Sequence, residues 1–357
     1  MILGMVAAWN DLGVVPDVLT ADLRIDPDRI ADRYPVEIEA NFIEIDRGPK
    51  LPTELAIIEF NRRLQRLDGQ YDLLINTGNS LWGLPKDQQV LTYLFFPRKV
   101  RVESSAVSIH QPDVPLGAFT RHGVERRVAR QIYRRARLRP EHDIVCMTQF
   151  TREALRSAYG VEDELPIIYP PVDFDSYTSS ADKQAQVATM GRFVPDKRQV
   201  EQIRAARDLP ELPFHIMGFA GNGSYLATCR TELGQAAAPN VTLWPDMAFD
   251  RVQATLGQSR YFLHTLVDEP FGLTAVEAIA AGCLPVVHDS GGQRETVPVE
   301  ELRYRSFAEI PETFRALEGR TDAERSEIVN RLQHHARTEF SAAAFDTGIK
   351  SVFERYL

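Results

Sequence analysis

Residues 269–282 read EPFGLTAVEAIAAG, and no other segment says as much about the fold and chemistry of this chain. A turn carrying Glu269 and Gly272 opens the segment, and an apolar run of helical character follows it. Gly282 ends this run, as a glycine at a helix C-terminus does. Backbone N–H groups are unpaired at the start of such a helix, and the helix dipole favours an anion there.

Glu277 lies inside the apolar run, eight residues after Glu269. A carboxylate in such surroundings costs free energy unless a polar group meets it. An anion site flanked by two carboxylates suits a sugar attached to a diphosphate.

The whole chain has the composition of a globular protein. Its 357 residues are enough for two domains, with 44% hydrophobic and 25% charged residues. A net charge of −9 argues against nucleic acid as a partner. The three cysteines form no metal-ligand pair and no disulfide framework, which favours buried, inert thiols in a reducing cytoplasm. We find neither an apolar run of about 18 residues nor a signal-peptide pattern.

Strand-like apolar runs alternate with helical patterns throughout the chain. Near-continuous apolar runs are typical of parallel strands covered on both faces, so the fold class is predicted as α/β with parallel sheets. We expect strands at residues 17–23, 71–76, 90–96, 144–148, 167–169, 186–190, 214–218, 261–265 and 284–288.

A Pro-Pro break at residues 170 and 171, followed by a polar stretch, predicts a domain boundary. We expect one domain at residues 1–170 and a second at residues 171–340, each doubly wound and Rossmann-like. A last helix at residues 341–357 is expected to pack back across the boundary. The cleft between two such domains is the natural ligand site.

Four turns that follow predicted strands of the second domain carry glycines, cations and carboxylates. In residues 191–197, Arg192 and Lys197 lie five residues apart on a turn shaped by glycine and proline. A guanidinium and an ammonium can converge there on one phosphate group, although a solvated pair of surface charges would look the same. Glycine-rich turns follow at residues 218–223 and 289–292, where backbone can approach a ligand closely. These turns share the carboxyl edge of a parallel sheet, which makes their coincidence informative.

These motifs, in this order, resemble the nucleotide-sugar half of the retaining GT-B glycosyltransferases of family four. The resemblance covers residues 140–340 and rests on Gly191-Arg192-Phe193 with Lys197, Glu269 with Phe271-Gly272-Leu273 and Glu277, Ala281-Gly282 with Pro285-Val286-Val287, and Ser290-Gly291-Gly292 with Glu295. Leu263-His264-Thr265 and the segment at residues 287–292 further resemble lipid-linked-oligosaccharide α-1,2-mannosyltransferases, which would imply GDP-mannose as donor. The residues alone do not separate GDP from UDP.

The resemblance implies a role for each residue of the motifs. Arg192 and Lys197 would hold the donor diphosphate and neutralise it as it leaves, in place of a metal, so no cofactor is expected. Glu269 would accept hydrogen bonds from the sugar and Glu277 from the ribose, with front-face transfer and retention. The backbone N–H groups of Gly272, Leu273 and Thr274 would face the diphosphate. The full set of residues expected to bind the donor is Gly191, Phe271, Gly272, Leu273, Thr274 and Glu277.

The first half departs from the family pattern in two places. Residues 1–12 are predicted as a helix where the family has a strand and a glycine-rich loop, so the first strand is expected to be missing. Phe95 occupies the position of a family histidine, and Phe95 cannot hydrogen-bond a sugar hydroxyl. An alternative function therefore stays open, a non-catalytic nucleotide-sugar-binding partner of a complete glycosyltransferase.

Two further features of the first half each have two interpretations. The segment Asn76-Thr77-Gly78-Asn79 is an acceptor-side turn or a plain Asn-Gly turn. Residues 121–139 predict an arginine-rich amphipathic helix, which is either an ordinary domain helix or a peripheral contact with the inner face of a membrane.

The sequence thus predicts a cytoplasmic, metal-independent, retaining hexosyltransferase. Its donor is a nucleotide sugar, with GDP-mannose favoured, and its acceptor a glycan, a lipid-linked molecule or a small molecule. A nicotinamide dehydrogenase would need a Gly-x-Gly-x-x-Gly turn opening a helix, and the turn at residues 218–223 lacks that spacing.

Overall fold

The structure is a computed structural model that divides into two compact units, Met1–Pro170 with Phe345–Leu357, and Pro171–Ala344. We call them unit 1 and unit 2 and describe each by itself. The described residues are 1–20, 37–44, 59, 63–67, 69–77, 84, 88–97, 100–103, 106–109, 142–161, 164–221 and 223–357.

Unit 1 contains short parallel sheets. Strands β3 (Leu74–Asn76), β4 (Val90–Leu94) and β7 (His142–Cys146) form a parallel sheet in the order β3-β4-β7. All five residues of β4 are buried, as the central strand of a covered sheet requires. The other described elements are the parallel pair β1 (Asp17–Thr20) and β2 (Asn41–Glu44), the antiparallel pair β5 (Val100–Glu103) and β6 (Ala106–Ile109), and helices α1 (Ile2–Asp11) and α5 (Gln149–Tyr159).

Helix α13 (Ala342–Phe353) brings the C-terminal residues into unit 1. The ring of Phe353 stacks on Trp9 of α1 with centroids 4.2 Å apart. The Lys350 ammonium lies 2.6 Å from the carboxylate of Asp11, and the Tyr356 hydroxyl donates to Asp143. Aromatic packing and these polar contacts hold the end of the chain against α1 and β7.

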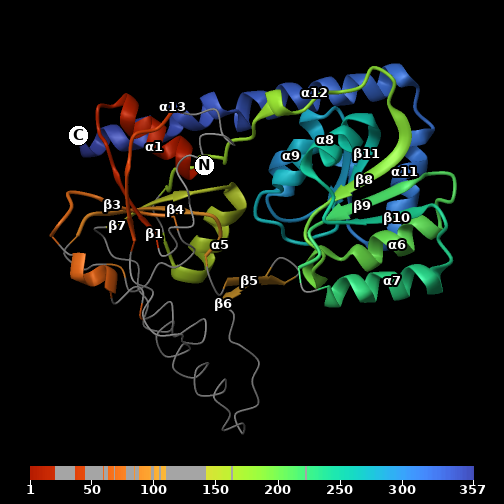
Figure 1. The fold of residues 1–357 in the computed structure, drawn as a ribbon, viewed down its shortest axis with the longest axis horizontal. Coiled ribbons are helices and arrows are strands. Elements are labelled where there is room, and N and C mark those ends of the chain that lie inside the picture. The colour runs from red at the N-terminus through yellow and green to blue at the C-terminus, as the bar shows by residue number, and fades with distance from the viewer. Residues whose placement is uncertain are drawn as a thin grey trace, which may run out of the picture. The chain divides into compact units, whose positions relative to one another are not determined.

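Unit 2 is built on one parallel sheet of six strands (Figure 1). The strand order is β10-β9-β8-β11-β12-β13, so the chain winds outward from β8 in one direction and then restarts beside it with β11. The strands are β8 (Gln184–Met190), β9 (Phe214–Gly218), β10 (Val241–Pro245), β11 (Ser259–Leu263), β12 (Leu284–His288) and β13 (Arg303–Tyr304).

Helices connect these strands. Figure 1 shows α6 and α7 lying together along the sheet, and α12 packs on α9. The helices are α6 (Gln199–Arg207), α7 (Ser224–Ala236), α8 (Phe249–Gln258), α9 (Leu273–Ala280), α10 (Gln293–Thr296), α11 (Ile310–Glu318) and α12 (Asp322–Phe340).

The α/β class with parallel sheets is confirmed. The expected strands at residues 214–218 and 284–288 have the predicted bounds, and the expected helix at residues 1–12 is α1. The strand expected at residues 167–169 is wrong, because Ile167 makes only an isolated bridge to Cys146. The expectation for residues 121–139 lies outside the described residues.

The three cysteines are free and buried, as expected. Burial raises the pKa of the Cys283 thiol to about 11, which leaves it protonated and unreactive near neutral pH.

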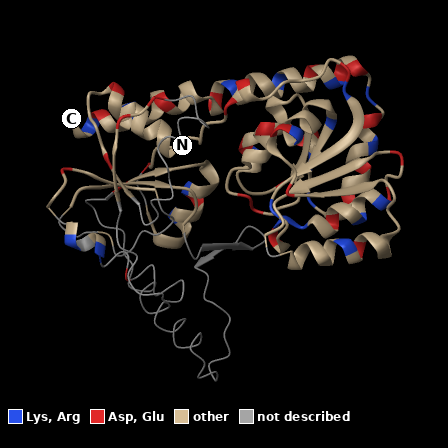
Figure 2. Ribbon diagram, viewed as in Figure 1, with Lys and Arg blue, Asp and Glu red and all other residues tan. Residues whose placement is uncertain are grey.

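None of the described helices combines the length and hydropathy that a membrane span needs. The longest, α12, carries Lys or Arg interspersed with Asp or Glu along its length (Figure 2).

Candidate functional site

The order of the strands puts a topological switch point in unit 2, the place where doubly wound domains have their ligand crevice. Strands β8 and β11 are neighbours, but their connections leave in opposite directions along the sheet. Loops at the carboxyl ends of two such strands diverge and leave room for a ligand, the topological switch point of doubly wound sheets. The turn after β8 carries Arg192 and Lys197, and the turn after β11 carries Glu269.

The turn after β8 is held in place by backbone packing against the turn after β9. A Cβ atom on Gly218 would lie 1.6 Å from the carbonyl oxygen of Gly191, so only glycine fits at position 218. The N–H of Phe193 donates to the carbonyl oxygen of Phe219 at 2.9 Å, and the Phe193 side chain is buried. This packing fixes the backbone on both sides of Arg192.

A chain of buried hydrogen bonds positions Lys197. The hydroxyl of Thr265, just after β11, donates to the carbonyl oxygen of Lys197 at 2.7 Å. The Thr265 oxygen accepts from the Gln202 amide at 2.8 Å, and Gln202 accepts from Thr189 of β8 at 3.0 Å. A satisfied buried network of this kind makes local geometry rigid.

Lys197 and Glu269 form an ion pair. The ammonium Nζ lies 2.8 Å from Glu269 Oε2, and both side chains are mostly buried. The Nε2 atom of His264, also after β11, lies 3.5 Å from the same oxygen, longer than a hydrogen bond of ordinary length. Burial by itself would raise the pKa of Glu269, but His264 and Lys197 outweigh burial and lower it to about 2. Because burial keeps His264 neutral by lowering its pKa, we assign the charge that holds Glu269 ionised to Lys197.

The main chain of the Glu269 turn packs against a second glycine-bearing turn, at residues 290–292. The N–H of Gly292 donates to the carbonyl oxygen of Glu269 at 2.8 Å. A Cβ atom on Gly292 would lie 2.1 Å from the carbonyl oxygen of Pro270, and one on Gly291 would lie 2.5 Å from that of Glu269. Both glycines are therefore required by close backbone approach.

Helix α9 starts immediately after this turn. Gly272 precedes it with φ of +98°, a conformation that favours glycine. Among the described residues, the N–H groups of Leu273 and Thr274 have no hydrogen-bond acceptor, and Leu273 is 45% exposed. An open helix N-terminus with free N–H groups is suited to an anion. The Phe271 side chain is buried and packs edge-on against Phe340, so it anchors the turn from within the unit.

Glu277 lies one turn into α9 and is partly buried. Burial raises its pKa to about 7, although a hydrogen bond from the Tyr177 hydroxyl works in the opposite direction. The sequence required a polar partner for Glu277 but did not identify Tyr177.

The remaining predicted site residues are Arg192 in unit 2 and the acceptor-side segment in unit 1. The guanidinium of Arg192 is exposed and has no ion-pair partner within the described part of the chain. Asn76 ends β3 in unit 1 and Thr77 follows the strand, and the Asn76 amide donates to Thr92 at 3.2 Å. Gly78 and Asn79 lie outside the described residues.

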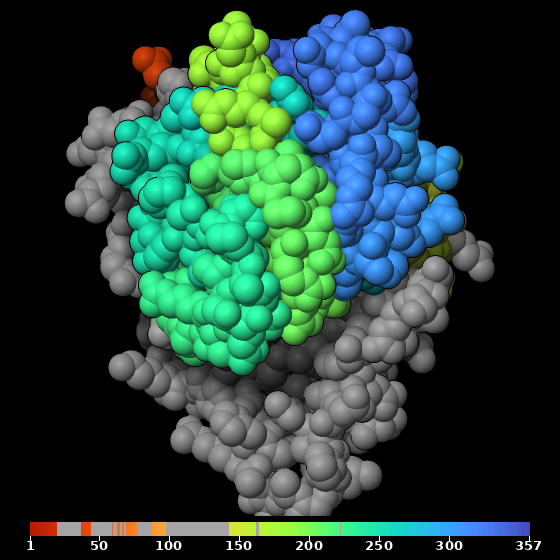
Figure 3. All heavy atoms as spheres, turned by 90° about the vertical axis from the view of Figure 1, so that its right-hand side faces the viewer, coloured from red at the N-terminus to blue at the C-terminus, as the bar shows by residue number. Residues whose placement is uncertain are grey.

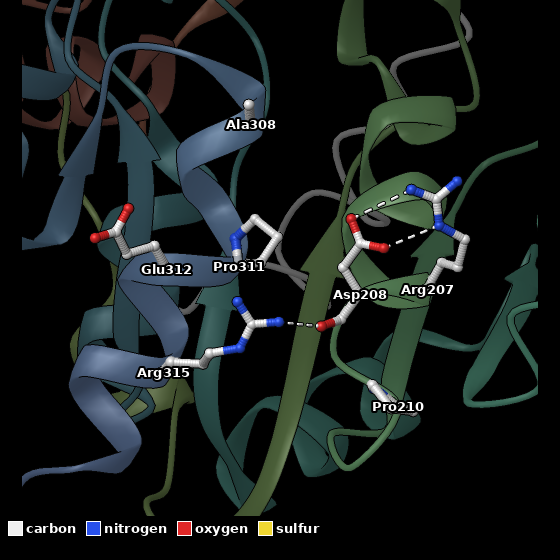
Figure 4. Close-up of a pocket in the computed structure, with 7 residues that line it drawn as sticks. All are labelled: Arg207, Asp208, Pro210, Ala308, Pro311, Glu312 and Arg315. Carbon is white, nitrogen blue, oxygen red and sulfur yellow. Dashed lines mark hydrogen bonds and ion pairs between the residues drawn. The ribbon is translucent and has the colours of Figure 1, made fainter.

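One pocket in unit 2, of about 580 Å³, lies elsewhere. Arg207, Asp208 and Pro210, at the end of α6, line it together with Arg315 and other residues from α11 and the segment before it (Figure 4). Figure 3 shows the face of unit 2 on which these segments adjoin. Because α6 leaves the carboxyl end of β8 and returns to the start of β9, this pocket lies at the opposite edge of the sheet from Lys197 and Glu269. The Arg207 guanidinium forms an ion pair with the Asp208 carboxylate, and the Arg315 guanidinium donates to the main-chain carbonyl oxygen of Asp208.

A parallel sheet in this order, with charged side chains and a helix N-terminus at its switch point, is the architecture of nucleotide-binding α/β domains. Residues 174–304 match the sequence model of the family described as glycosyl transferases group 1. This part of the chain is a group 1 glycosyl transferase domain.

The chain is similar to several curated proteins. It is 26% identical over 196 residues to the GDP-Man:Man(3)GlcNAc(2)-PP-Dol α-1,2-mannosyltransferase of Xenopus laevis, covering 48% of this chain and 40% of that one. The human protein of the same name is 26% identical over 179 residues, covering 44% and 36%. The chain thus spans less than half the length of these two relatives.

Solved structures show the fold over nearly the whole chain. A glycosyltransferase from Rickettsia africae has a TM-score of 0.69 at 13% identity, covering 99% of this chain and 92% of its own. A sucrose-phosphate synthase from Thermosynechococcus elongatus has a TM-score of 0.71 at 14% identity, covering 98% and 91%. An Anabaena protein in complex with UDP-glucose has a TM-score of 0.66 at 16% identity, covering 99% and 94%. The predicted GT-B fold is confirmed by these neighbours.

Proposed function

We propose that this chain is a retaining, metal-independent glycosyltransferase that moves a hexose from a nucleoside-diphosphate sugar. The observation that carries this proposal is the Lys197–Glu269 ion pair beside the open N-terminus of α9. A diphosphate in the crevice would meet the Lys197 ammonium and the N–H groups of Leu273 and Thr274. Arg192, exposed and unpaired within the described part of the chain, would supply a second cation.

These groups would do the work of a metal ion. Negative charge develops on the bridging oxygen of the diphosphate as the bond to the sugar breaks. Fixed donors aimed at that charge lower the barrier without reorganising during the reaction. We therefore expect transfer to proceed without a divalent cation and without any other cofactor.

The carboxylates would hold the two sugars of the donor. Glu269, ionised and held beside Lys197, would accept hydrogen bonds from the hexose hydroxyls. Glu277 would accept hydrogen bonds from the ribose. Both carboxylates would act on the donor, and neither would need to serve as a nucleophile, which favours a front-face transfer with retention.

The favoured donor is GDP-mannose. Two relatives are named as enzymes that use GDP-Man, and their similarity reaches about half of this chain. The acceptor would be a glycan, a lipid-linked molecule or a small molecule. We expect a cytoplasmic protein, and contact with the inner face of a membrane stays one of the two interpretations of residues 121–139.

A screen of GDP- and UDP-sugars by thermal shift tests donor binding, since a ligand at a hundred times its Kd raises stability by about 2.7 kcal/mol. Transfer is then measured with the donor that binds, with and without EDTA, and the anomeric configuration of the product is read by NMR. Glu269→Ala and Arg192→Ala should each lower kcat/KM strongly. Full activity in both variants, or loss of activity in EDTA, would contradict the proposal.

A second function is favoured by one observation in unit 1. Phe95 follows β4, and its ring packs edge-on against Tyr93 with centroids 5.7 Å apart. This position has no hydrogen-bonding side chain for a sugar hydroxyl. A non-catalytic nucleotide-sugar-binding partner would bind the donor in calorimetry and show neither transfer nor hydrolysis, and Phe95→His would not restore them.

A further inference from the structure

Unpartnered polar atoms gather around Glu269. Among the described residues, His264 Nε2, Gln293 Oε1 and Thr274 Oγ1 are buried and make no hydrogen bond. Buried polar atoms are nearly always satisfied, so a group of such atoms requires an explanation. His264 is 3% exposed and Gln293 is fully buried, and both lie beside the turn that carries Glu269.

The hydrogen bond on the other side of the imidazole decides where its proton lies. The Gln293 amide nitrogen contacts His264 Nδ1. An amide N–H donates, so Nδ1 accepts and the neutral ring carries its proton on Nε2. In the reverse orientation the amide oxygen would face Nδ1, and the ring proton would lie on Nδ1. The unprotonated Nε2 and the Glu269 carboxylate would then be two hydrogen-bond acceptors facing each other. The geometry thus aims an Nε2–H group at Glu269 Oε2, 3.5 Å away.

The Lys197 ammonium has two possible anionic partners, the Glu269 carboxylate and a donor diphosphate. It binds Glu269 now, and in the function proposed above it also binds the incoming diphosphate. When the ammonium moves toward the diphosphate, the buried Glu269 carboxylate loses its closest donor. An unsatisfied buried carboxylate is costly and would rotate or take up a proton, and its oxygens would then no longer meet the sugar.

We propose that His264 is the positioning residue of Glu269, with its Nε2–H as the donor that keeps this carboxylate oriented when Lys197 engages the diphosphate. Gln293 acts through His264 by fixing the tautomer. The part that concerns the diphosphate rests on the proposed function. The contact between His264 and Glu269 does not depend on it.

The backbone at His264 is secured without its imidazole. The His264 N–H donates to Val286 of β12 at 2.9 Å, and its carbonyl oxygen accepts from the Tyr304 hydroxyl at 2.9 Å. Side-chain variants at position 264 can therefore test the imidazole without removing these two main-chain bonds.

The first experiment needs no donor. Carbon-13 NMR follows the titration of the Glu269 carboxyl group in Lys197→Met, where His264 is the remaining donor, and in the same variant combined with His264→Leu. We expect the Glu269 pKa to rise clearly when leucine replaces His264, and to fall back when His264→Gln restores an N–H at a similar reach. Tyr304→Phe is the control, since it removes the hydroxyl that donates to the His264 carbonyl oxygen but keeps the imidazole. Equal titration with and without the imidazole, or an equal rise in the control, overturns the proposal.

The second experiment uses the active protein. His264→Leu should lower kcat about tenfold to a hundredfold, the size of one lost hydrogen bond to a charged group, with little change in the affinity for the nucleoside diphosphate alone. His264→Gln should recover most of the loss, and failure to recover it in a folded variant overturns the proposal. If the wild type binds no nucleotide sugar, the proposed function fails, and the NMR titration still decides the role of His264.

Discussion

Glu277 allows a direct test of whether a buried carboxylate lowers the stability of the fold while it strengthens ligand binding. Replacing it by glutamine keeps its shape and removes its charge. Burial raises the pKa of Glu277 from 4.5 to about 7, and this difference corresponds to about 3 kcal/mol of free energy of unfolding. Because the folded-state pKa is the higher one, this stability is fully present below pH 4.5 and is lost as the pH rises through 7.

The Tm of Glu277→Gln should therefore equal that of the wild type at pH 4.5. At pH 8 it should lie roughly 6–12 °C above the wild-type Tm, as measured by calorimetry. The same variant should bind GDP about fivefold more weakly at pH 8, because a neutral amide accepts a weaker hydrogen bond from the ribose than a carboxylate does. Glu327→Gln, at an exposed position of α12, is the matched control and should change neither quantity. A thermal shift independent of pH, or unchanged GDP affinity, would refute this reasoning.

Three further outcomes are expected. Lys197→Met should lower kcat/KM by about a hundredfold to a thousandfold in steady-state assays, since it removes a preorganised charge from the diphosphate. Glu269→Gln should remove stability that the wild type retains above pH 4.5 and loses as the pH falls through about 2, which acid unfolding measures. Gly292→Ala should destabilise unit 2 by more than about 3 kcal/mol in urea unfolding, because its Cβ would lie 2.1 Å from a backbone oxygen, whereas Gly234→Ala, with no atom within 4 Å, should stay within about 1 kcal/mol of wild type.

Much of unit 2 could be predicted from the sequence because its central strands are covered on both faces. Strands β9 and β12 are compact and mostly buried, and turn residues follow them, so their bounds could be predicted. Strand β10 could not, because it lies at the sheet edge, exposes alternate residues and ends at a proline. An edge strand lacks the continuous apolar signal of a buried one.

The charged residues of the site could be predicted from the sequence, but the residues that hydrogen-bond to them could not. Lys197 and Glu269 stood out as charges in glycine-bearing turns, and the structure places them 2.8 Å apart. Tyr177 and Gln293 carried no such signal, because a tyrosine or a glutamine near a turn is common, and only folding brings them to Glu277 and His264.

The Lys197–Glu269 pair also lets two mostly buried charges stabilise each other. A lysine held near the positive end of a helix would repel it and would be poorly solvated when mostly buried. Glu269 offsets that charge, and its own ionisation is maintained by the same contact. A diphosphate that displaces Glu269 from Lys197 must therefore compete with a carboxylate at 2.8 Å. It can do so because it offers more negative charge and can also engage the N–H groups at the start of α9. A monoanion lacks that advantage, so we expect the pair to favour diphosphates over singly charged ligands.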